Sequence, residues 1–164
     1  MAASQTTLTV GDRLPDVTLP RVDDGSPVDL RGSVRDAAVV VFTHPDCDGC
    51  DDYVAALASG IEDLGDWNAV VRVVPSGRAP AASEDLAVVE DEDGALRRRC
   101  GLDPDVAAVV VADRFGEVWE VTSAEDGHDL PDPDQVESWA RFLATQCPEC
   151  GVPDRPDTGG WVVW

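Results

Sequence analysis

The chain has 164 residues, 43% of them hydrophobic, which suffices for a single domain with a buried core. It carries 33 acidic and 12 basic residues, every basic residue is arginine, and the formal net charge is −21. Nucleic acids and anionic membranes attract basic patches, so this charge argues against both as partners. The acidic residues are spread along the chain, which is typical of an acidic, salt-adapted surface whose self-repulsion is screened by counterions.

Apolar patterning predicts an α/β domain. Alternating or continuous apolar runs predict strands within 11–20 and at 28–30, 37–43, 68–74, 86–89, 106–112 and 117–121. Apolar residues spaced three and four apart predict helices at 49–64, 95–100 and 133–147. The strand at 37–43 is apolar on both faces, which predicts a central and parallel position. This order of elements implies a central mixed β-sheet with helices on both faces.

No stretch approaches the length of a membrane span, and residues 1–7 lack the basic and apolar segments of a targeting sequence. We therefore expect a cytoplasmic protein with no membrane association. In a reducing compartment, five cysteines are more typical of catalysis or metal binding than of a disulfide scaffold.

The first cysteine pair, Cys47 and Cys50, has Cys-x-x-Cys spacing where the strand at 37–43 leads into the helix at 49–64. The dipole and free N–H groups of a helix N-terminus favour a thiolate at Cys47, the form that attacks disulfides. Cys50, one turn further, lies close enough to attack the resulting mixed disulfide. The pattern predicts a redox pair; half of a metal site and two inert buried thiols are the alternatives.

Four residues before the pair are candidate active-site neighbours: Thr43, His44, Pro45 and Asp46. His44 adds a positive charge if it is protonated, although a packed or solvent-facing side chain is the commoner role of a lone histidine. The carboxylates near Cys47 disfavour a second anion there; they are Asp46, Asp48, Asp51 and Asp52. We therefore predict a reducing pair, because a destabilised thiolate disfavours the reduced form.

A second pair, Cys147 and Cys150, follows the last predicted helix and begins a tail at 147–164. It could relay electrons to the first pair, clamp the tail as a disulfide, or form half of a metal site. One metal site made of Cys47, Cys50, Cys147 and Cys150 would require the tail to fold over the first pair. The tail ends in two tryptophans, which disordered segments lack, so we expect it to dock on the domain formed by 1–146.

Two further features have simple interpretations. Cys100 precedes a glycine at the end of the helix at 95–100 and reads as a buried apolar thiol. The run Arg97-Arg98-Arg99 is the only basic cluster and reads as a solvated helix face; a docking spot for an acidic partner is the alternative.

Several short motifs carry a resemblance to a known family. Gly11–Leu19 matches a G-x-x-x-P-x-x-x-L opening, and Phe42–Cys50 matches a strand end with Cys-x-x-Cys. Val88–Gly101 and Val110–Val118 each match a strand followed by D-x-x-G. In this order, over about residues 10–145, the chain resembles the redoxin and peroxiredoxin-like (alkyl hydroperoxide reductase/thiol-specific antioxidant) branch of the thioredoxin superfamily.

This resemblance implies a thioredoxin-like fold and a thiol–disulfide oxidoreductase that needs no cofactor, with Cys47 and Cys50 as catalytic residues. The implied partners are a protein disulfide, or a small thiol or hydroperoxide, together with an electron donor that the sequence does not identify.

The chain departs from the family in two places. The proline that thioredoxins carry opposite the active site would fall near Ala107–Ala108, where there is none. The peroxiredoxin motif Pro-x-x-x-Thr-x-x-Cys has Val40 and His44 in place of its proline and threonine. A peroxiredoxin-like thiol peroxidase with a peroxidatic Cys47 therefore ranks second to the oxidoreductase. A metal- or partner-binding module using both cysteine pairs is the non-enzymatic alternative.

Overall fold

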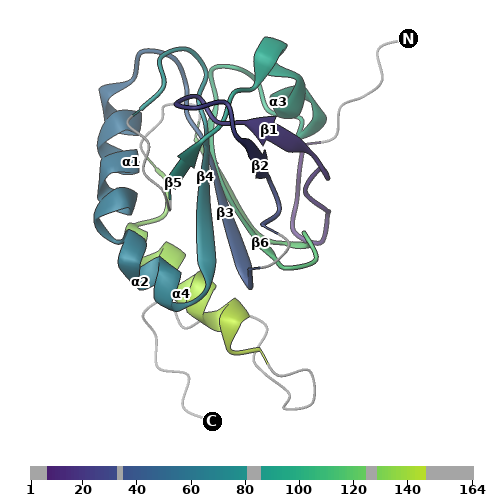
Figure 1. The fold of residues 1–164 in the computed structure, drawn as a ribbon, viewed down its shortest axis with the longest axis vertical. Coiled ribbons are helices and arrows are strands. Elements are labelled where there is room, and N and C mark those ends of the chain that lie inside the picture. The colour runs from purple at the N-terminus through teal and green to yellow at the C-terminus, as the bar shows by residue number, and fades with distance from the viewer. Residues whose placement is uncertain (1–6, 33–34, 81–85, 125–128, 147–164) are drawn as a thin grey trace.

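The structure is a computed structural model that describes residues 7–32, 35–80, 86–124 and 129–146. Its centre is a five-stranded mixed sheet in the order β5-β4-β3-β6-β7 (Figure 1). The strands of this sheet are β3 (Ala37–Phe42), β4 (Ala69–Val74), β5 (Leu86–Val88), β6 (Ala107–Asp113) and β7 (Val118–Ala124). The helices are α1 (Asp48–Ser59), α2 (Ile61–Asp66), the 3-10 turn η1 (Glu92–Gly94), α3 (Ala95–Arg99) and α4 (Pro133–Ala144).

The middle strand of the sheet is β3, as its sequence predicts. All six of its residues are buried, and it runs parallel to β4 and antiparallel to β6. The predicted parallel pairing is therefore right on one side of the strand only. Because neither face of β3 meets solvent, polar side chains at alternate positions would be buried, which explains its continuous apolar run.

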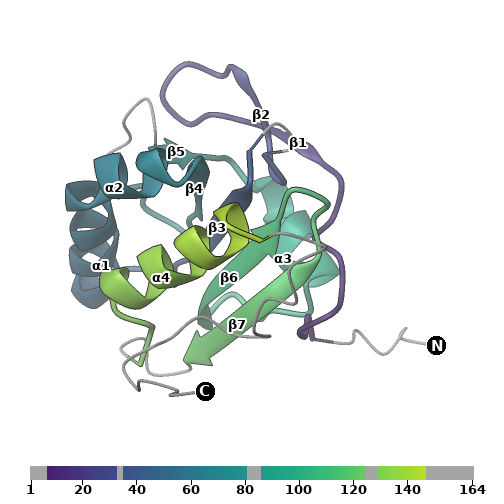
Figure 2. The ribbon, with the colours of Figure 1, turned by 90° about the horizontal axis from the view of Figure 1, so that it is seen from below.

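Two layers cover the sheet, and the side chains of β3 alternate between them. Val39 and Val41 face a core shared with α1, α2 and α4. Val40 and Phe42 face a second core shared with α3 and with the antiparallel ribbon of β1 (Thr18–Pro20) and β2 (Pro27–Asp29). Figure 2 shows the three helices on one face and α3 with the ribbon on the other. The predicted mixed sheet with helices on both faces is confirmed.

The single helix predicted at 49–64 is wrong, because the chain leaves the helix at Gly60. Its backbone (φ −99°, ψ 13°) ends α1, and its N–H donates to the Leu57 carbonyl at 3.1 Å. Glycine weakens a helix interior, and the break lets α2 pack against both β4 and α4. The last helix also ends early, at Ala144.

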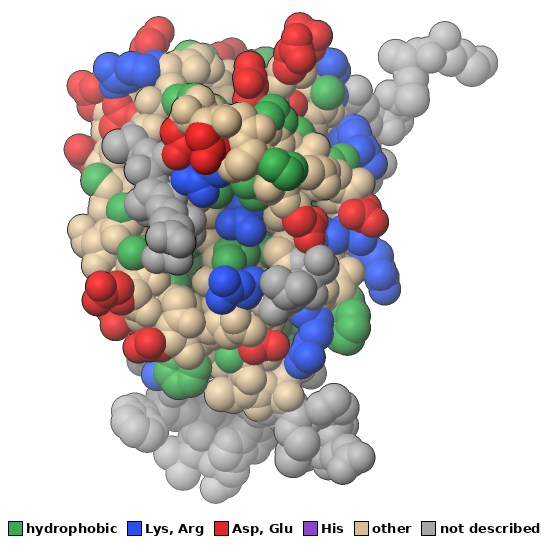
Figure 3. Space-filling model, in the orientation of Figure 1, with side chains coloured by type: hydrophobic (Ala, Val, Ile, Leu, Met, Phe, Trp, Pro, Cys, Tyr) green, Lys and Arg blue, Asp and Glu red, His purple; other side chains and the backbone are tan. Residues whose placement is uncertain are grey.

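The predicted tail at 147–164 and its cysteine pair lie outside the described residues, so the domain boundary and the docking of the tail stay predictions. Among the described residues, no helix combines the length and hydrophobicity that crossing a membrane requires. Acidic side chains are scattered over the face drawn in Figure 3, with arginine side chains between them.

The close packing of the sheet against the turn after β2 gives a stability prediction. Gly32 and Gly25 both have positive φ angles, of 57° and 72°, so alanine costs about 1 kcal/mol of strain at either. A Cβ at Gly32 would lie 2.7 Å from Cγ2 of Val70, whereas one at Gly25 would meet nothing within 4 Å. We expect Gly32→Ala to lower the free energy of unfolding by about 1–3 kcal/mol more than Gly25→Ala does. Urea unfolding of the two variants measures this difference, and equal values would contradict the predicted clash.

Candidate active site

A turn between β3 and α1 presents the first cysteine pair. Thr43 prolongs the ladder beyond β3, because its N–H donates to the Val74 carbonyl at 3.2 Å. Asp46 has a left-handed backbone (φ 50°), a conformation that aspartate tolerates better than most residues. Cys47 then caps α1, so the sequence-predicted order of strand, turn and helix is present.

The two cysteines differ in accessibility. Cys47 is half-buried at the N-cap, and its Sγ accepts the Cys50 N–H at 3.4 Å. Cys50 lies beneath it with 2% of its surface exposed. Both are free thiols and lie 3.8 Å apart, a separation that small side-chain rotations can reduce to bonding distance. An incoming molecule therefore meets Cys47 first.

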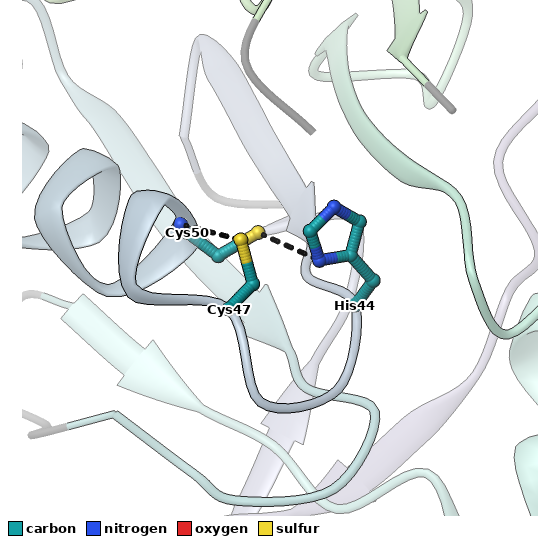
Figure 4. A group of neighbouring side chains, drawn as sticks. All are labelled: His44, Cys47 and Cys50. Atoms are coloured by element: carbon teal, nitrogen blue, oxygen red, sulfur yellow. Dashed lines mark hydrogen bonds between the residues drawn. The ribbon is translucent and has the colours of Figure 1, made fainter. Parts of the chain in front are cut away.

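His44 completes the cluster. Its Nδ1 lies 3.6 Å from Sγ of Cys50, and Figure 4 shows the ring turned toward the two sulfur atoms. The ring nitrogen and both sulfurs lie within 4.8 Å of one another. Burial raises the pKa of the Cys50 thiol above its ordinary value; a backbone hydrogen bond from His44 opposes this shift, and nearby Cys47 and Asp51 add to it. Cys50 therefore holds its proton more firmly than an exposed cysteine does.

The remaining predicted neighbours form the rim of the site. Pro45 and Asp46 are exposed, while Thr43 is buried under the turn. A loop after β4 flanks this rim, since a Cβ at Gly77 would lie 3.5 Å from that of Pro45. In the same loop Arg78 forms an ion pair with Asp51 in the first turn of α1, which offsets one of the carboxylates near Cys47. The sequence carries no signal for this loop contact.

A buried arginine holds the turn through hydrogen bonds to its backbone. Arg97 is only 3% exposed, so the prediction of a solvated helix face at 97–99 is wrong for this residue, although Arg98 and Arg99 are exposed. Its Nη2 donates to the Thr43 carbonyl and, at 3.2 Å, to that of Val74. Its Nη1 donates to the Val106 carbonyl at 3.0 Å.

This guanidinium therefore joins the chain just after β3, the end of β4 and the residue before β6. Its carbon also lies 5.5 Å from the centre of the Phe42 ring. The available sequence signal was the spacing of three between Arg97 and Cys100, which places both on the inner side of α3.

Other predicted residues lie away from the cluster. Cys100 is fully buried, as predicted, and burial raises its pKa to about 11. Ala108 pairs with Phe42, so the place expected for the thioredoxin proline does lie beside the active-site turn. The described residues contain no cis peptide bond.

Removal of the Arg97 guanidinium should destabilise the fold. Arg97→Met removes the guanidinium donor from the carbonyls of Thr43 and Val106, while Val74 keeps the Thr43 N–H, so we expect the free energy of unfolding to fall by about 2–4 kcal/mol. The matched variant Arg98→Met alters an exposed side chain and should change the free energy of unfolding by less than about 0.5 kcal/mol. Chemical denaturation of both variants tests this. A stabilised Arg97→Met protein would mean that burying the charge costs more than its hydrogen bonds contribute.

The three described cysteines should react with iodoacetamide in a fixed order. At pH 8 we expect Cys47 to react first, and Cys50 and Cys100 at least about tenfold more slowly, because both are buried and have raised pKa values. A raised pKa means that the reactive thiolate forms only at higher pH, so the rates at Cys50 and Cys100 should continue to rise above pH 9. Peptide mass spectrometry after timed alkylation gives each rate. Faster modification of Cys50 than of Cys47 would contradict the predicted order.

Comparison with known proteins gives a structural likeness and no sequence match. Neither a protein-family model nor a curated protein sequence matches the chain. A protein from Chlorobium tepidum named as a thiol:disulfide interchange protein, DsbE, is similar to it with a TM-score of 0.66 and 19% identity, over 84% of this chain and 99% of that one.

Two peroxiredoxin structures are similar to the same degree. Peroxiredoxin Q of Xanthomonas campestris gives a TM-score of 0.63 and 17% identity, over 83% of this chain and 99% of that one. Peroxidoxin BcpB of Mycobacterium tuberculosis gives a TM-score of 0.62 and 19% identity, over 82% of this chain and 95% of that one. The chain therefore shares the fold of these structures, the thioredoxin-like fold that its motif order predicts.

Proposed function

We propose that the protein is a thiol–disulfide oxidoreductase with Cys47 as nucleophile and Cys50 as resolving thiol. The observation that carries the proposal is the difference in exposure between two sulfurs at the start of one helix. Cys47 is accessible and Cys50 is buried directly beneath it. A substrate can therefore reach only the sulfur of Cys47. The buried sulfur of Cys50 can in turn attack only a disulfide formed at Cys47.

The reaction divides into two exchanges. The Cys47 thiolate attacks one sulfur of the substrate disulfide, whose S–S bond breaks, and the departing thiolate takes a proton from solvent. Cys50 then loses its proton and attacks Sγ of Cys47, so that the mixed disulfide breaks and the second substrate thiolate leaves. The substrate gains two electrons and two protons, and the enzyme is left with a Cys47–Cys50 disulfide. A donor dithiol reverses these steps to restore it.

His44 supports the second exchange. Its Nδ1 lies 3.6 Å from Sγ of Cys50, where a neutral imidazole can accept the thiol proton. Such help matters because the Cys50 thiol has a raised pKa. The first exchange does not involve His44, since it begins at Cys47, whose Sγ accepts the Cys50 N–H at the start of α1.

The amino-acid composition and the structural similarity to DsbE further support the proposed oxidoreductase. The DsbE of Chlorobium tepidum is named for thiol:disulfide interchange. The substrate class we infer is a protein disulfide or a small disulfide that reaches the exposed rim formed by Pro45 and Asp46. A reducing compartment such as the cytoplasm suits the role, because thiols stay reduced there. The acidic, lysine-free composition suits a salt-adapted surface.

A thiol peroxidase is the second candidate. The likeness to peroxiredoxin Q and to BcpB favours it, as does the accessible Cys47. In that reaction the Cys47 thiolate takes an oxygen from a hydroperoxide, becomes a sulfenic acid and releases an alcohol; Cys50 then condenses with it to a disulfide and water. The two reactions differ in their need for Cys50 during the first turnover. Release of a fully reduced disulfide substrate requires Cys50, whereas the hydroperoxide is reduced before Cys50 acts.

Cysteine variants should separate the two candidates. We expect Cys47→Ser to abolish reduction of insulin disulfides, and Cys50→Ser to accumulate a mixed disulfide on Cys47 that mass spectrometry detects. Cys100→Ser is the matched control, since this buried thiol takes no part in the exchange, and it should retain wild-type activity. Rapid hydroperoxide consumption by Cys50→Ser, without insulin reduction by the wild type, would replace the oxidoreductase by the peroxidase.

The carboxylate beside Cys47 should make the pair more reducing. Asp46→Asn removes a negative charge and keeps a residue that tolerates the left-handed backbone of this position. Less repulsion stabilises the reduced form, so we expect the reduction potential to become less negative by about 10 mV or more. Equilibration with glutathione redox buffers measures it. Asp52→Asn, further along α1, serves as the control and should shift the potential less; an unchanged potential in Asp46→Asn would contradict the predicted effect.

A further inference from the structure

We propose that His44, Cys47 and Cys50 form a binding site for one zinc ion when the two cysteines are reduced. The site differs from one made of four cysteines, because an imidazole from the turn supplies the third ligand and the C-terminal pair takes no part. It uses the sulfurs of the proposed redox pair but does not rest on their redox activity.

The spacing of two of the three pairs of ligand atoms is that of zinc coordination, and the third pair comes within a small side-chain rotation of it. Zn–S bonds of about 2.3 Å and Zn–N bonds of about 2.0 Å, at tetrahedral angles, place neighbouring ligand atoms roughly 3.5–3.8 Å apart. Cys47 and Cys50 lie 3.8 Å apart, and Nδ1 of His44 lies 3.6 Å from Sγ of Cys50. The third edge is at most 4.8 Å. Because a Zn–S and a Zn–N bond together span about 4.3 Å, a small rotation of the Cys47 or His44 side chain lets one ion contact all three atoms.

The donor set selects the class of metal. Two thiolates and one imidazole are soft and borderline ligands, which suit zinc and exclude magnesium and calcium, because those ions require oxygen ligands. Three protein ligands leave a fourth tetrahedral position for water. The half-buried Cys47 and the exposed turn residues Pro45 and Asp46 give solvent access on that side.

Charges near the site act in both directions. Two thiolates neutralise the ion's double charge when both cysteines bind it. Asp46 and Asp48 are exposed beside Cys47 and attract a cation toward it. The guanidinium of Arg97 interacts electrostatically with Cys50 but is buried, and Arg78 is paired with Asp51. The exposed Asp46 and Asp48 therefore set a negative charge on the solvent side of Cys47, which suits entry of a metal ion from outside.

Binding would exclude the redox reaction. Each thiol loses one proton as its sulfur binds the ion, so two protons are released and no electrons move. A Cys47–Cys50 disulfide has no thiolates to offer, so the oxidised protein should not bind zinc. A zinc ion on the reduced pair should in turn protect both sulfurs from oxidation and alkylation.

Cobalt titration of the full-length reduced protein tests the site. We expect one equivalent of Co²⁺ to give thiolate-to-cobalt charge-transfer absorption and the visible bands of a tetrahedral ion, both removed by one equivalent of Zn²⁺. Competition against a chromophoric chelator then gives the zinc affinity. His44→Ala should weaken it by at least about tenfold, and Cys47→Ser should abolish the charge-transfer band. Circular dichroism checks that each variant is folded.

Two controls decide which residues bind the ion. Cys100→Ser and the double variant Cys147→Ser/Cys150→Ser should bind zinc as the wild type does. Loss of binding in the double variant would overturn the proposal in favour of the four-cysteine site, and wild-type affinity in His44→Ala would overturn the role of the imidazole. Insulin reduction by metal-free protein is measured separately, so failure to bind zinc leaves the oxidoreductase proposal intact, and failure to reduce disulfides leaves the zinc proposal intact.

Discussion

The geometry of the active site depends on a buried guanidinium. The carbonyl groups of Thr43, Val74 and Val106, beside the ends of three neighbouring strands, lie within hydrogen-bond reach of one guanidinium. Buried carbonyls need donors, and Arg97 supplies them to Thr43, Val74 and Val106. Its burial lowers its pKa, which Asp91 opposes, and that same carboxylate accepts the backbone N–H groups of Leu96 and Arg97. The arginine is therefore tied to the helix that carries it and to the turn that it supports.

A turn held in this way can keep two sulfurs at a fixed distance. The backbone of Thr43 is bonded both to β4 and to Arg97, so the following residues leave the sheet in a defined direction. That direction brings the ring of His44 against Cys50 and leaves Cys47 at the head of α1. The chemistry of the site thus follows from backbone hydrogen bonding as much as from the identity of the cysteines.

The same three side chains support both proposals, and the redox state decides between them. Thiol–disulfide exchange needs two sulfurs that can move from 3.8 Å to bonding distance, whereas zinc needs them to stay apart. His44 has a part in each, as a proton acceptor for Cys50 or as a metal ligand. A zinc ion would therefore compete directly with a disulfide substrate for reduced protein, and oxidation of the pair would release the ion.

The amino-acid sequence by itself determined the central strand, the order of elements and a Cys-x-x-Cys at the start of a helix. These features are encoded by neighbouring residues: a continuous apolar run in β3, and a three-residue spacing that any helix N-terminus converts into proximity. Only the tertiary structure decided that Arg97 is buried while Arg98 is exposed, that Arg78 reaches Asp51, and that His44 faces Cys50. The first two contacts join segments distant in the sequence, and the third depends on a turn whose path is set by such contacts. No local pattern specifies where strand ends converge, so the residue that satisfies their carbonyls becomes visible only when the sheet is assembled.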